Sequence, residues 1–206
     1  MKKILCFGDS NTWGFAPGSG KRFDAQTRWP SVLQLVLGNS AKVVEAGCCN
    51  RTAFVDNPDG IEQTGYKILQ KYLDSSYDIV LLALGINDLQ RYFKPSDLQI
   101  KNGITKLVEK TKQLAPNAEV LLIVPAVLSD DIFSNYFKEQ FDTESIVQSQ
   151  RLPDIFKQVA EDKKVLLFNL NDFVKVSEVD GLHFTAEAHK KIAKELGLFI
   201  KQNFNM

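Results

Sequence analysis

The sequence predicts an α/β fold organised around a mainly parallel β-sheet. Five short apolar runs alternate with segments of helical periodicity, which is the pattern of strand–helix–strand units joined by right-handed crossovers. Their apolar residues are mostly consecutive and do not alternate with polar residues, as is typical of strands that helices cover on both faces. No linker, repeat or low-complexity stretch divides the 206 residues. We therefore expect a single domain spanning residues 1–206.

The apolar runs give the expected strands, which lie at residues 3–7, 42–46, 79–84, 120–124 and 165–168. Gly8, Gly47 and Gly85 follow the first three, and Pro125 follows the fourth. Glycine and proline are the strongest local signals for the end of a regular element. The strand ends, where sites form in parallel sheets, can therefore be located in the sequence.

Helical periodicity gives four expected helices, at about residues 30–37, 100–114, 146–160 and 185–201. Pro30 suits the first turn of the first helix and Gly38 its end. Ser96 is a candidate cap for the second. Pro153 lies inside the third and is expected to break or kink it, because proline removes a backbone hydrogen bond.

Composition and charge exclude several classes of function. Lys and Arg number 25, as do Asp and Glu, so the net charge is zero and no stretch supplies the basic surface that nucleic acid requires. Three cysteines and two histidines show no metal-ligand spacing, so a structural zinc site is not expected. No run approaches the roughly 20 apolar residues that cross a bilayer, and no signal-peptide pattern is present. We expect a cytoplasmic protein with no nucleic-acid or membrane partner.

Polar residues at the strand ends suit nucleophilic catalysis. Ser10 follows the first strand, where a nucleophile would have a rigid support and nearby backbone N–H groups, although a serine there is more often a helix cap. Asp180 and His183 are three residues apart, so the carboxylate can accept the Nδ1 proton of the imidazole and leave Nε2 as a general base. Taken alone, that pair is more often a capping aspartate beside a surface histidine.

Gly47 and Asn87 follow the second and third strands. A glycine N–H and a carboxamide N–H aimed at one point can stabilise the oxyanion of a tetrahedral intermediate. Singly, each residue is commonly a turn glycine or a loop-structuring asparagine. Their occurrence at successive strand ends, together with the serine and histidine, favours an acyl-transfer site.

Four sequence blocks resemble those of the SGNH hydrolases, also called GDSL-type esterases and lipases. They occur in the family's order and read Gly8-Asp9-Ser10-Asn11-Thr12-Trp13-Gly14, then Gly47, then Gly85-Ile86-Asn87-Asp88, then Asp180-Gly181-Leu182-His183. The Asn-Thr-Trp-Gly continuation is most similar to the arylesterase-like branch. The resemblance implies a flavodoxin-like three-layer α/β/α sandwich with a five-stranded parallel sheet in the order 2-1-3-4-5. It implies neither a metal nor an organic cofactor.

The same resemblance implies a role for each matched residue. Ser10 would be the nucleophile, His183 the base and Asp180 its partner. The Ser10 backbone N–H, the Gly47 N–H and the Asn87 side chain would form the oxyanion hole. Asp9 and Asp88 are interpreted as carboxylates that brace their loops, and Cys48 and Cys49 as small packing residues.

Two positions depart from the family pattern. Relatives often read Asn-x-Gly-x-x-Gly-Arg-Thr in the second block, and here Glu45 and Asn50 replace the first Asn and the second Gly. The oxyanion hole should persist because Gly47 is kept. The shape of the loop and the edge of the substrate site are left open. Trp13, Phe15 and Val127 are the candidate substrate-binding residues.

Residues 129–141 follow the fourth strand and exceed what a short connection requires. They are expected to form a short amphipathic helix with one aromatic stripe, composed of Phe133, Tyr136, Phe137 and Phe141. The stripe could pack on the protein's own helices. Alternatively, it could wall the acyl pocket and contact another subunit, which predicts a homo-oligomer.

The sequence therefore predicts a serine esterase that hydrolyses short-chain carboxylic esters through an acyl-enzyme on Ser10. One alternative is an acyltransferase that uses the same acyl-enzyme. A different class, a non-catalytic binding module on the same fold, is disfavoured because the triad and the oxyanion hole are both complete. A phosphate loop at residues 18–22 is disfavoured because no strand closely precedes it and Arg22 replaces the Ser or Thr.

Overall fold

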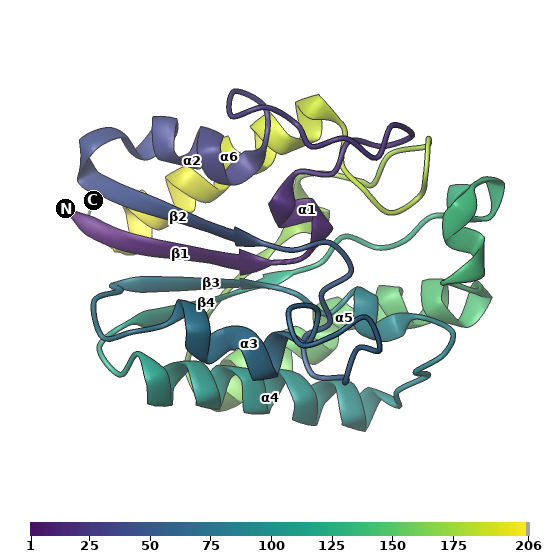
Figure 1. Ribbon diagram of the computed structural model, residues 1–206. Coiled ribbons are helices and arrows are strands. Elements are labelled where there is room, and N and C mark those ends of the chain that lie inside the picture. Colours follow the sequence, from purple (N-terminus) through teal and green to yellow (C-terminus); the bar gives the residue numbers. More distant parts are fainter. Residues whose placement is uncertain (205–206) are drawn as a thin grey trace.

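A five-stranded parallel sheet lies between two layers of helices in the computed structural model, which describes residues 1–204 (Figure 1). The strands are β1 (Lys2–Gly8), β2 (Ala41–Gly47), β3 (Ile79–Ala83), β4 (Glu119–Val124) and β5 (Leu166–Asn169). Their order in the sheet is β2-β1-β3-β4-β5, and every neighbouring pair is parallel. The fold class that the sequence predicted and the strand order that the family resemblance implied are both confirmed.

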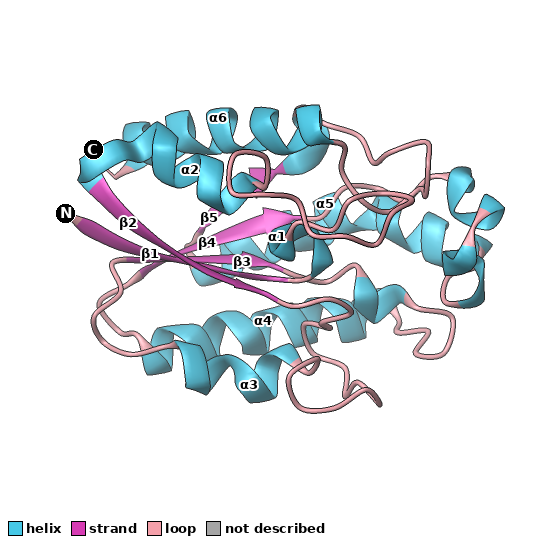
Figure 2. Ribbon diagram, turned by 45° about the horizontal axis from the view of Figure 1, so that its top comes forward, coloured by secondary structure: helices cyan, strands magenta, loops and turns pink. Residues whose placement is uncertain are grey.

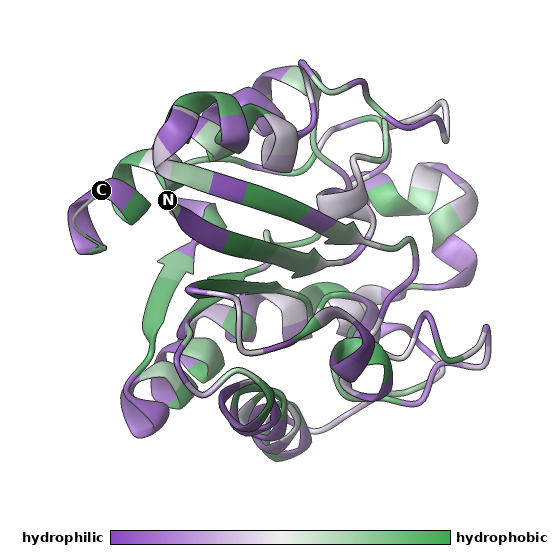
Figure 3. Ribbon diagram, turned by 60° about the vertical axis from the view of Figure 1, so that its left-hand side comes forward, coloured by the Kyte–Doolittle hydropathy of each residue, from purple (hydrophilic) through white to green (hydrophobic). Residues whose placement is uncertain are grey.

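The two helical layers differ in size. The helices α2 (Trp29–Leu37) and α6 (Ala186–Asn203) pack together on one face, and α3 (Gly65–Tyr72), α4 (Asp97–Leu114) and α5 (Thr143–Lys163) cover the other (Figures 1 and 2). Short helical turns lie in the connections: α1 (Ser10–Trp13), η1 (Gly38–Ser40), η2 (Asn87–Leu89), η3 (Asp130–Ser134), η4 (Tyr136–Glu139) and η5 (Leu170–Asp172). Figure 3 shows hydrophobic residues along the strands and a mixed pattern on the helices.

Successive residues of each strand point to opposite layers, which explains why the apolar runs are continuous. In β1, Leu5 and Phe7 belong to the core beneath α3, α4 and α5, whereas Ile4 and Cys6 belong to the core beneath α2 and α6. All four are fully buried. Both faces of the sheet therefore demand apolar side chains.

Capping residues set the bounds of the long helices. Ser96 accepts a hydrogen bond from the Gln99 N–H and the Gln99 side chain accepts one from the Ser96 N–H, which makes a capping box at α4. Thr185 caps α6 in a similar way, through the Ala188 N–H. Pro153 does not break α5, which continues to Lys163. The buried side chains that follow it hold the helix on the sheet, and they are Ile155, Phe156 and Val159.

Because every neighbouring pair of strands is parallel, the carboxyl ends of all five lie at one edge of the sheet. The N-terminus lies at the opposite edge (Figure 1). At the site edge, Gly8 of β1 pairs with Gly47 of β2 and with Ala83 of β3. The loops that follow these three strands are therefore neighbours. Across residues 1–204, none of the helices combines the length and the apolar character that crossing a membrane requires.

Candidate active site

Ser10, His183 and Asp180 form a hydrogen-bonded chain at the carboxyl edge of the sheet. The Ser10 Oγ lies 2.9 Å from the His183 Nε2, and the His183 Nδ1 lies 2.8 Å from the Asp180 Oδ2. All three residues are at most 5% exposed. Residues that are 173 positions apart in the sequence thus meet with the polarity of a nucleophile, a base and an orienting carboxylate.

A tight turn holds Asp180 and His183 in this arrangement. The Asp180 Oδ1 accepts hydrogen bonds from the Leu182 and His183 N–H groups, at 3.1 and 2.9 Å. Gly181 has a φ of +68°, and a Cβ there would lie 2.4 Å from the Ile132 nitrogen, so the turn requires glycine. Burial by itself would raise the pKa of Asp180, but the hydrogen bonds and charge of His183 lower the pKa below its ordinary value. The carboxylate is therefore ionised at neutral pH.

Ser10 is the first residue of the single helical turn α1. Asp9 caps this turn by accepting the Asn11 N–H at 2.9 Å. The Asn11 side chain then joins α1 to the histidine loop, because its Nδ2 donates to the Leu182 carbonyl at 3.2 Å and its Oδ1 accepts the Phe184 N–H at 3.2 Å. Sequence reasoning gave Asn11 no role of its own. The contacts show that it fixes the two chain segments on either side of the Ser10–His183 hydrogen bond.

Gly47 is required by the close approach of α1 to β2. A Cβ at Gly47 would lie 2.2 Å from the Trp13 nitrogen, a distance that side chains do not reach. Gly47 is paired with Gly8, two residues before Ser10. The buried Arg51 ties the ends of the two strands together, because its Nη1 donates to the Gly8 carbonyl at 3.1 Å and to the Ala46 carbonyl at 2.5 Å.

Asn87 and Asp88 lie in the η2 turn after β3. The Asn87 Nδ2 donates to the Arg51 carbonyl at 3.1 Å, and Asn87 lines the same pocket as Ser10 and His183. The Asp88 carboxylate accepts the backbone N–H groups of residues 53–55, at 2.6 to 3.0 Å. Asp88 thus braces the loop after β2, as the sequence indicated, and Asn87 alone of the two faces the pocket.

The pocket at Ser10 has a volume of about 160 Å³. One wall is aromatic: the Phe15 ring stacks on the His183 ring at 4.1 Å, and the Phe137 ring lies 5.1 Å from the same ring. The other lining residues are Cys49, Asn50, Asp59, Asn87, Gln140 and Leu182.

Of the three candidate substrate-binding residues, the structure brings only Phe15 to this pocket. Trp13, at the end of α1, lies with its ring centre 5.4 Å from the Arg22 guanidinium. Val127 follows β4, and its N–H donates to the Asn171 Oδ1 at 2.9 Å. Neither residue lines the pocket.

Residues 129–141 do not form one amphipathic helix. Asn135 has an extended backbone and separates η3 from η4, and its side chain accepts the Phe137 N–H at 2.9 Å. The four aromatic side chains consequently point in different directions. Phe141 is buried in the core and Phe137 lies on His183, whereas Phe133 and Tyr136 are exposed. The expectation of a single aromatic stripe was wrong because helical periodicity does not survive an extended residue.

The loop after β2 contributes pocket residues that sequence reasoning did not assign. Cys49 was interpreted as a packing residue, yet it lines the pocket. Burial, together with the nearby Cys48 and Asp9, raises the pKa of its thiol to about 11. Cys49 is therefore a neutral thiol at pH 7 and no competing nucleophile. Within residues 1–204, His, Cys, Asp and Glu side chains form no group of three that could hold a metal ion.

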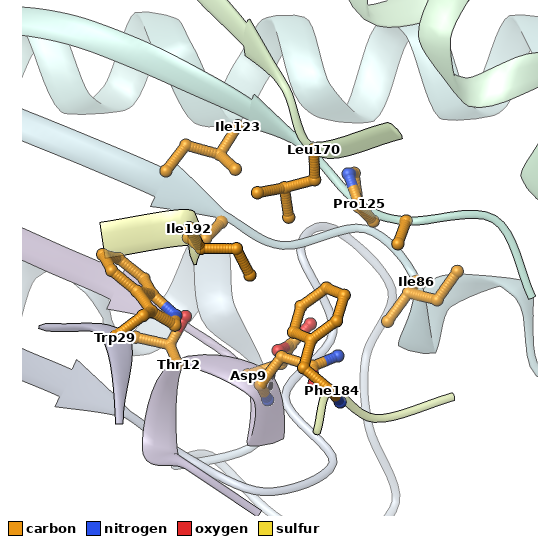
Figure 4. Close-up of a pocket in the computed structure, with 12 residues that line it drawn as sticks. Asp9, Thr12, Trp29, Ile86, Ile123, Pro125, Leu170, Phe184 and Ile192 are labelled. Carbon is orange, nitrogen blue, oxygen red and sulfur yellow. Dashed lines mark hydrogen bonds between the residues drawn. The ribbon is translucent and has the colours of Figure 1, made fainter. Parts of the chain in front are cut away.

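A second, smaller cavity of about 20 Å³ is lined in part by Asp9 and Thr12 (Figure 4). Apolar side chains surround most of it, among them Trp29, Ile123 and Phe184. Burial raises the pKa of Asp9 to about 7, against the lowering effects of the backbone N–H groups that it accepts. The volume suffices for one water molecule and excludes an acyl group.

Comparison with known proteins gives one family. The GDSL-like lipase/acylhydrolase family model matches residues 6–191, which include Ser10, Gly47, Asn87, Asp180 and His183. No curated protein matches the sequence.

Two solved structures are similar over nearly their whole lengths. Est24, a carbohydrate acetylesterase from Sinorhizobium meliloti, has 27% identity and a TM-score of 0.92, with 98% of this chain and 99% of that chain covered. The native aryl esterase of M. smegmatis has 29% identity and a TM-score of 0.90, with the same coverage of both chains.

Proposed function

Because the chain belongs to the GDSL-like lipase/acylhydrolase family, we propose that this carboxylic ester hydrolase acts through an acyl-enzyme on Ser10 and prefers short acyl chains. The observation that carries the proposal is the chain of contacts from Ser10 Oγ through His183 to Asp180, at 2.9 and 2.8 Å. Ser10 and His183 line a pocket that Asn87 also lines.

Acylation begins when the Ser10 Oγ attacks the ester carbonyl carbon. The hydroxyl proton passes to the His183 Nε2, the Oγ–C bond forms, and the carbonyl π electrons move onto the oxygen. Asp180 stabilises the resulting imidazolium and keeps the ring in the required tautomer. His183 then protonates the leaving alcohol as its C–O bond breaks.

Deacylation repeats these steps with water as the nucleophile. His183 takes a proton from water, the hydroxide attacks the acyl carbon, and the proton returns to the Ser10 Oγ as the acid leaves. In both halves of the reaction the oxyanion receives hydrogen bonds from the Ser10 and Gly47 N–H groups and from the Asn87 Nδ2. These donors are fixed before the reaction, because α1, the end of β2 and η2 are held by Asp9, Arg51 and their backbone partners.

The preference for short acyl chains rests on the size of the pocket. A volume of about 160 Å³ is below the 300–1,000 Å³ that is usual for ligand sites. Phe15 and Phe137 close one side of it. Similarity to an acetylesterase and to an aryl esterase supports the same preference, and a small acyl group on an aryl or sugar alcohol fits this arrangement.

Labelling with a fluorophosphonate tests the nucleophile directly. One residue should become modified, Ser10, and Ser10→Ala should lose turnover of p-nitrophenyl acetate by roughly 10⁶-fold, as expected for a covalent nucleophile. Ser19→Ala is the matched control, because Ser19 is an exposed loop serine, and it should keep both labelling and turnover. Modification of a different residue, with full activity in Ser10→Ala, would refute the assignment.

A further inference from the structure

Four polar side chains form a continuous row of hydrogen bonds from the mouth of the pocket to Asn87, the side-chain donor of the proposed oxyanion hole. The Asn50 Nδ2 donates to the Asp59 Oδ2 at 2.5 Å, and the Gln90 Nε2 donates to the Asn50 Oδ1 at 2.6 Å. The Gln90 Nε2 also lies 3.4 Å from the Asn87 Oδ1, as a second, longer contact. We call these residues, Asp59, Asn50, Gln90 and Asn87, the amide relay.

The charge of Asp59 sets the direction of every amide in the relay. An ionised carboxylate only accepts hydrogen bonds, so Asn50 must turn its Nδ2 toward Asp59 and its Oδ1 toward Gln90. Gln90 must then present its NH₂ group, and the second N–H of that group faces the Asn87 Oδ1. The Asn87 NH₂ group is consequently turned the other way, where one N–H meets the Arg51 carbonyl and the other is available to the pocket.

Asn50 joins the relay because of the departure from the family pattern. Its φ is +61°, in the left-handed region that favours glycine and that asparagine tolerates better than most residues. The Asn57 side chain fixes this backbone by donating to the Asn50 carbonyl at 2.7 Å. A glycine at this position would satisfy the backbone and would leave Gln90 without its shorter contact.

Burial favours the inner contact of the relay, between Gln90 and Asn87, whereas Asp59 at its outer end is exposed. Asn87 and Gln90 are each 4% exposed, so little water competes for their amide groups. We propose that Gln90, held by Asn50 and Asp59, is a positioning residue that keeps the Asn87 amide turned so that its NH₂ group faces the oxyanion. The proposal rests on the proposed function. Gln90 does not line the pocket and acts only through Asn87. An Asn87 amide turned by 180° would present its oxygen to the oxyanion and repel it.

Two substitutions of Gln90 separate orientation from space filling. Gln90→Met keeps the size of the side chain and removes both N–H donors. It should lower kcat by roughly 10-fold with little change in KM, because the hydrogen bond from Asn87 to the oxyanion forms fully only in the transition state. Gln90→Glu supplies only acceptors and should turn the Asn87 amide round, so the loss of kcat should be larger, about 10²-fold. Gln113→Met, at an exposed position of α4, is the matched control and should leave kcat unchanged.

A double-mutant cycle tests whether Gln90 acts through Asn87. Asn87→Ala should lower kcat by about 10²–10³-fold, and adding Gln90→Met should then cost less than about 2-fold more, since the group to be oriented is gone. Asn50→Gly, which suits the positive φ, offers a second disruption if Gln90 variants fold poorly, and it should lower kcat several-fold.

Three results would overturn the proposal. The first is a normal kcat in both Gln90→Met and Asn50→Gly. The second is an equal loss of kcat in Gln90→Met and Gln90→Glu. The third is a double variant whose loss of kcat equals the product of the losses in Gln90→Met and Asn87→Ala. Fluorophosphonate labelling of Ser10 is followed in each variant. Persistent labelling with any of these results refutes the relay and leaves the nucleophile intact, whereas labelling elsewhere in the wild type refutes the proposed function itself.

Discussion

The two histidines of the chain lie in different surroundings. His183 borders the pocket, whereas His189 is fully buried in α6, with its Nδ1 3.3 Å from the Trp29 N–H. The His189 Nε2 has no hydrogen-bond partner among the described residues. Burial, with a smaller contribution from the charge of His183, lowers the pKa of His189 to about 4. His189 is therefore a neutral core residue, and charging it would place an unpaired cation in the core.

Folding stability should depend on pH through His189. Between about pH 6.5 and pH 4 the unfolded chain binds a proton at this residue and the folded chain does not, so its contribution is complete above pH 6.5 and is lost as the pH falls toward 4. The shift to about 4 corresponds to roughly 3 kcal/mol. The buried Asp9, with its raised pKa of about 7, acts with the opposite sign in the same range, because its folded form keeps a proton that the unfolded form releases.

A comparison with His189→Leu isolates the histidine from the aspartate. The stability advantage of the wild type over this variant, measured by denaturant unfolding, should shrink by about 3 kcal/mol from pH 7 to pH 4. The ring signals of His189 in NMR spectra should stay those of a neutral imidazole down to about pH 5. A difference in the free energy of unfolding between the two proteins that does not change with pH would contradict this account. A His189 ring that titrates near pH 6.5 would contradict it as well.

At the scale of elements, η3 and η4 divide the aromatic residues of one segment between two tasks. Phe137 in η4 closes the pocket against Phe15 and His183. Phe133 in η3 and Tyr136 in η4 are 39% and 71% exposed. A substitution of Phe137 should therefore change the pocket, whereas a substitution of Phe133 should leave the pocket unchanged.

Phe137→Ala should widen the pocket and shift selectivity toward longer acyl chains. The ratio of kcat/KM for p-nitrophenyl hexanoate to that for the acetate should rise by roughly 10-fold, which is the effect of accommodating one or two of the additional methylenes at about 0.8 kcal/mol each. Phe133→Ala serves as the control and should keep the wild-type ratio. Equal ratios in all three proteins would show that Phe137 does not limit the acyl group.

At the scale of the whole molecule, a homo-oligomer stays a prediction. We propose that the exposed Phe133 and Tyr136 lie in the contact between subunits, because large apolar side chains grouped on the surface favour association. Phe133→Ser combined with Tyr136→Ser should lower the mass measured by light scattering. Leu35→Ser, which removes an exposed leucine of α2, should leave the mass unchanged. A monomeric wild type would end this proposal and would not affect the catalytic assignment.

The strands were predictable because the apolar runs and the turn residues that follow them coincide with the strands of the folded sheet. Each of the five strands lies within one residue of its predicted bounds at either end, since both faces of every strand need apolar residues and glycine or proline follows four of them. The helix α3 was not predicted. Its eight residues supply only two buried apolar side chains, Ile68 and Leu69, and such a short stripe carries little periodic signal.

The sequence by itself determined the α/β class and the ends of the strands, because these follow from hydrophobic periodicity and from the turns that glycine permits. The motif blocks at those ends, through their resemblance to a known family, implied the order of the strands. Only the tertiary structure decided which side chains share the pocket. Phe15 comes from the loop after α1, whereas Phe137 and Gln140 come from the connection between β4 and α5. Gln90 reaches Asn50 across 40 positions. Such contacts depend on the direction in which each loop leaves the sheet. That direction is set by packing between segments distant in sequence, and no local pattern encodes it.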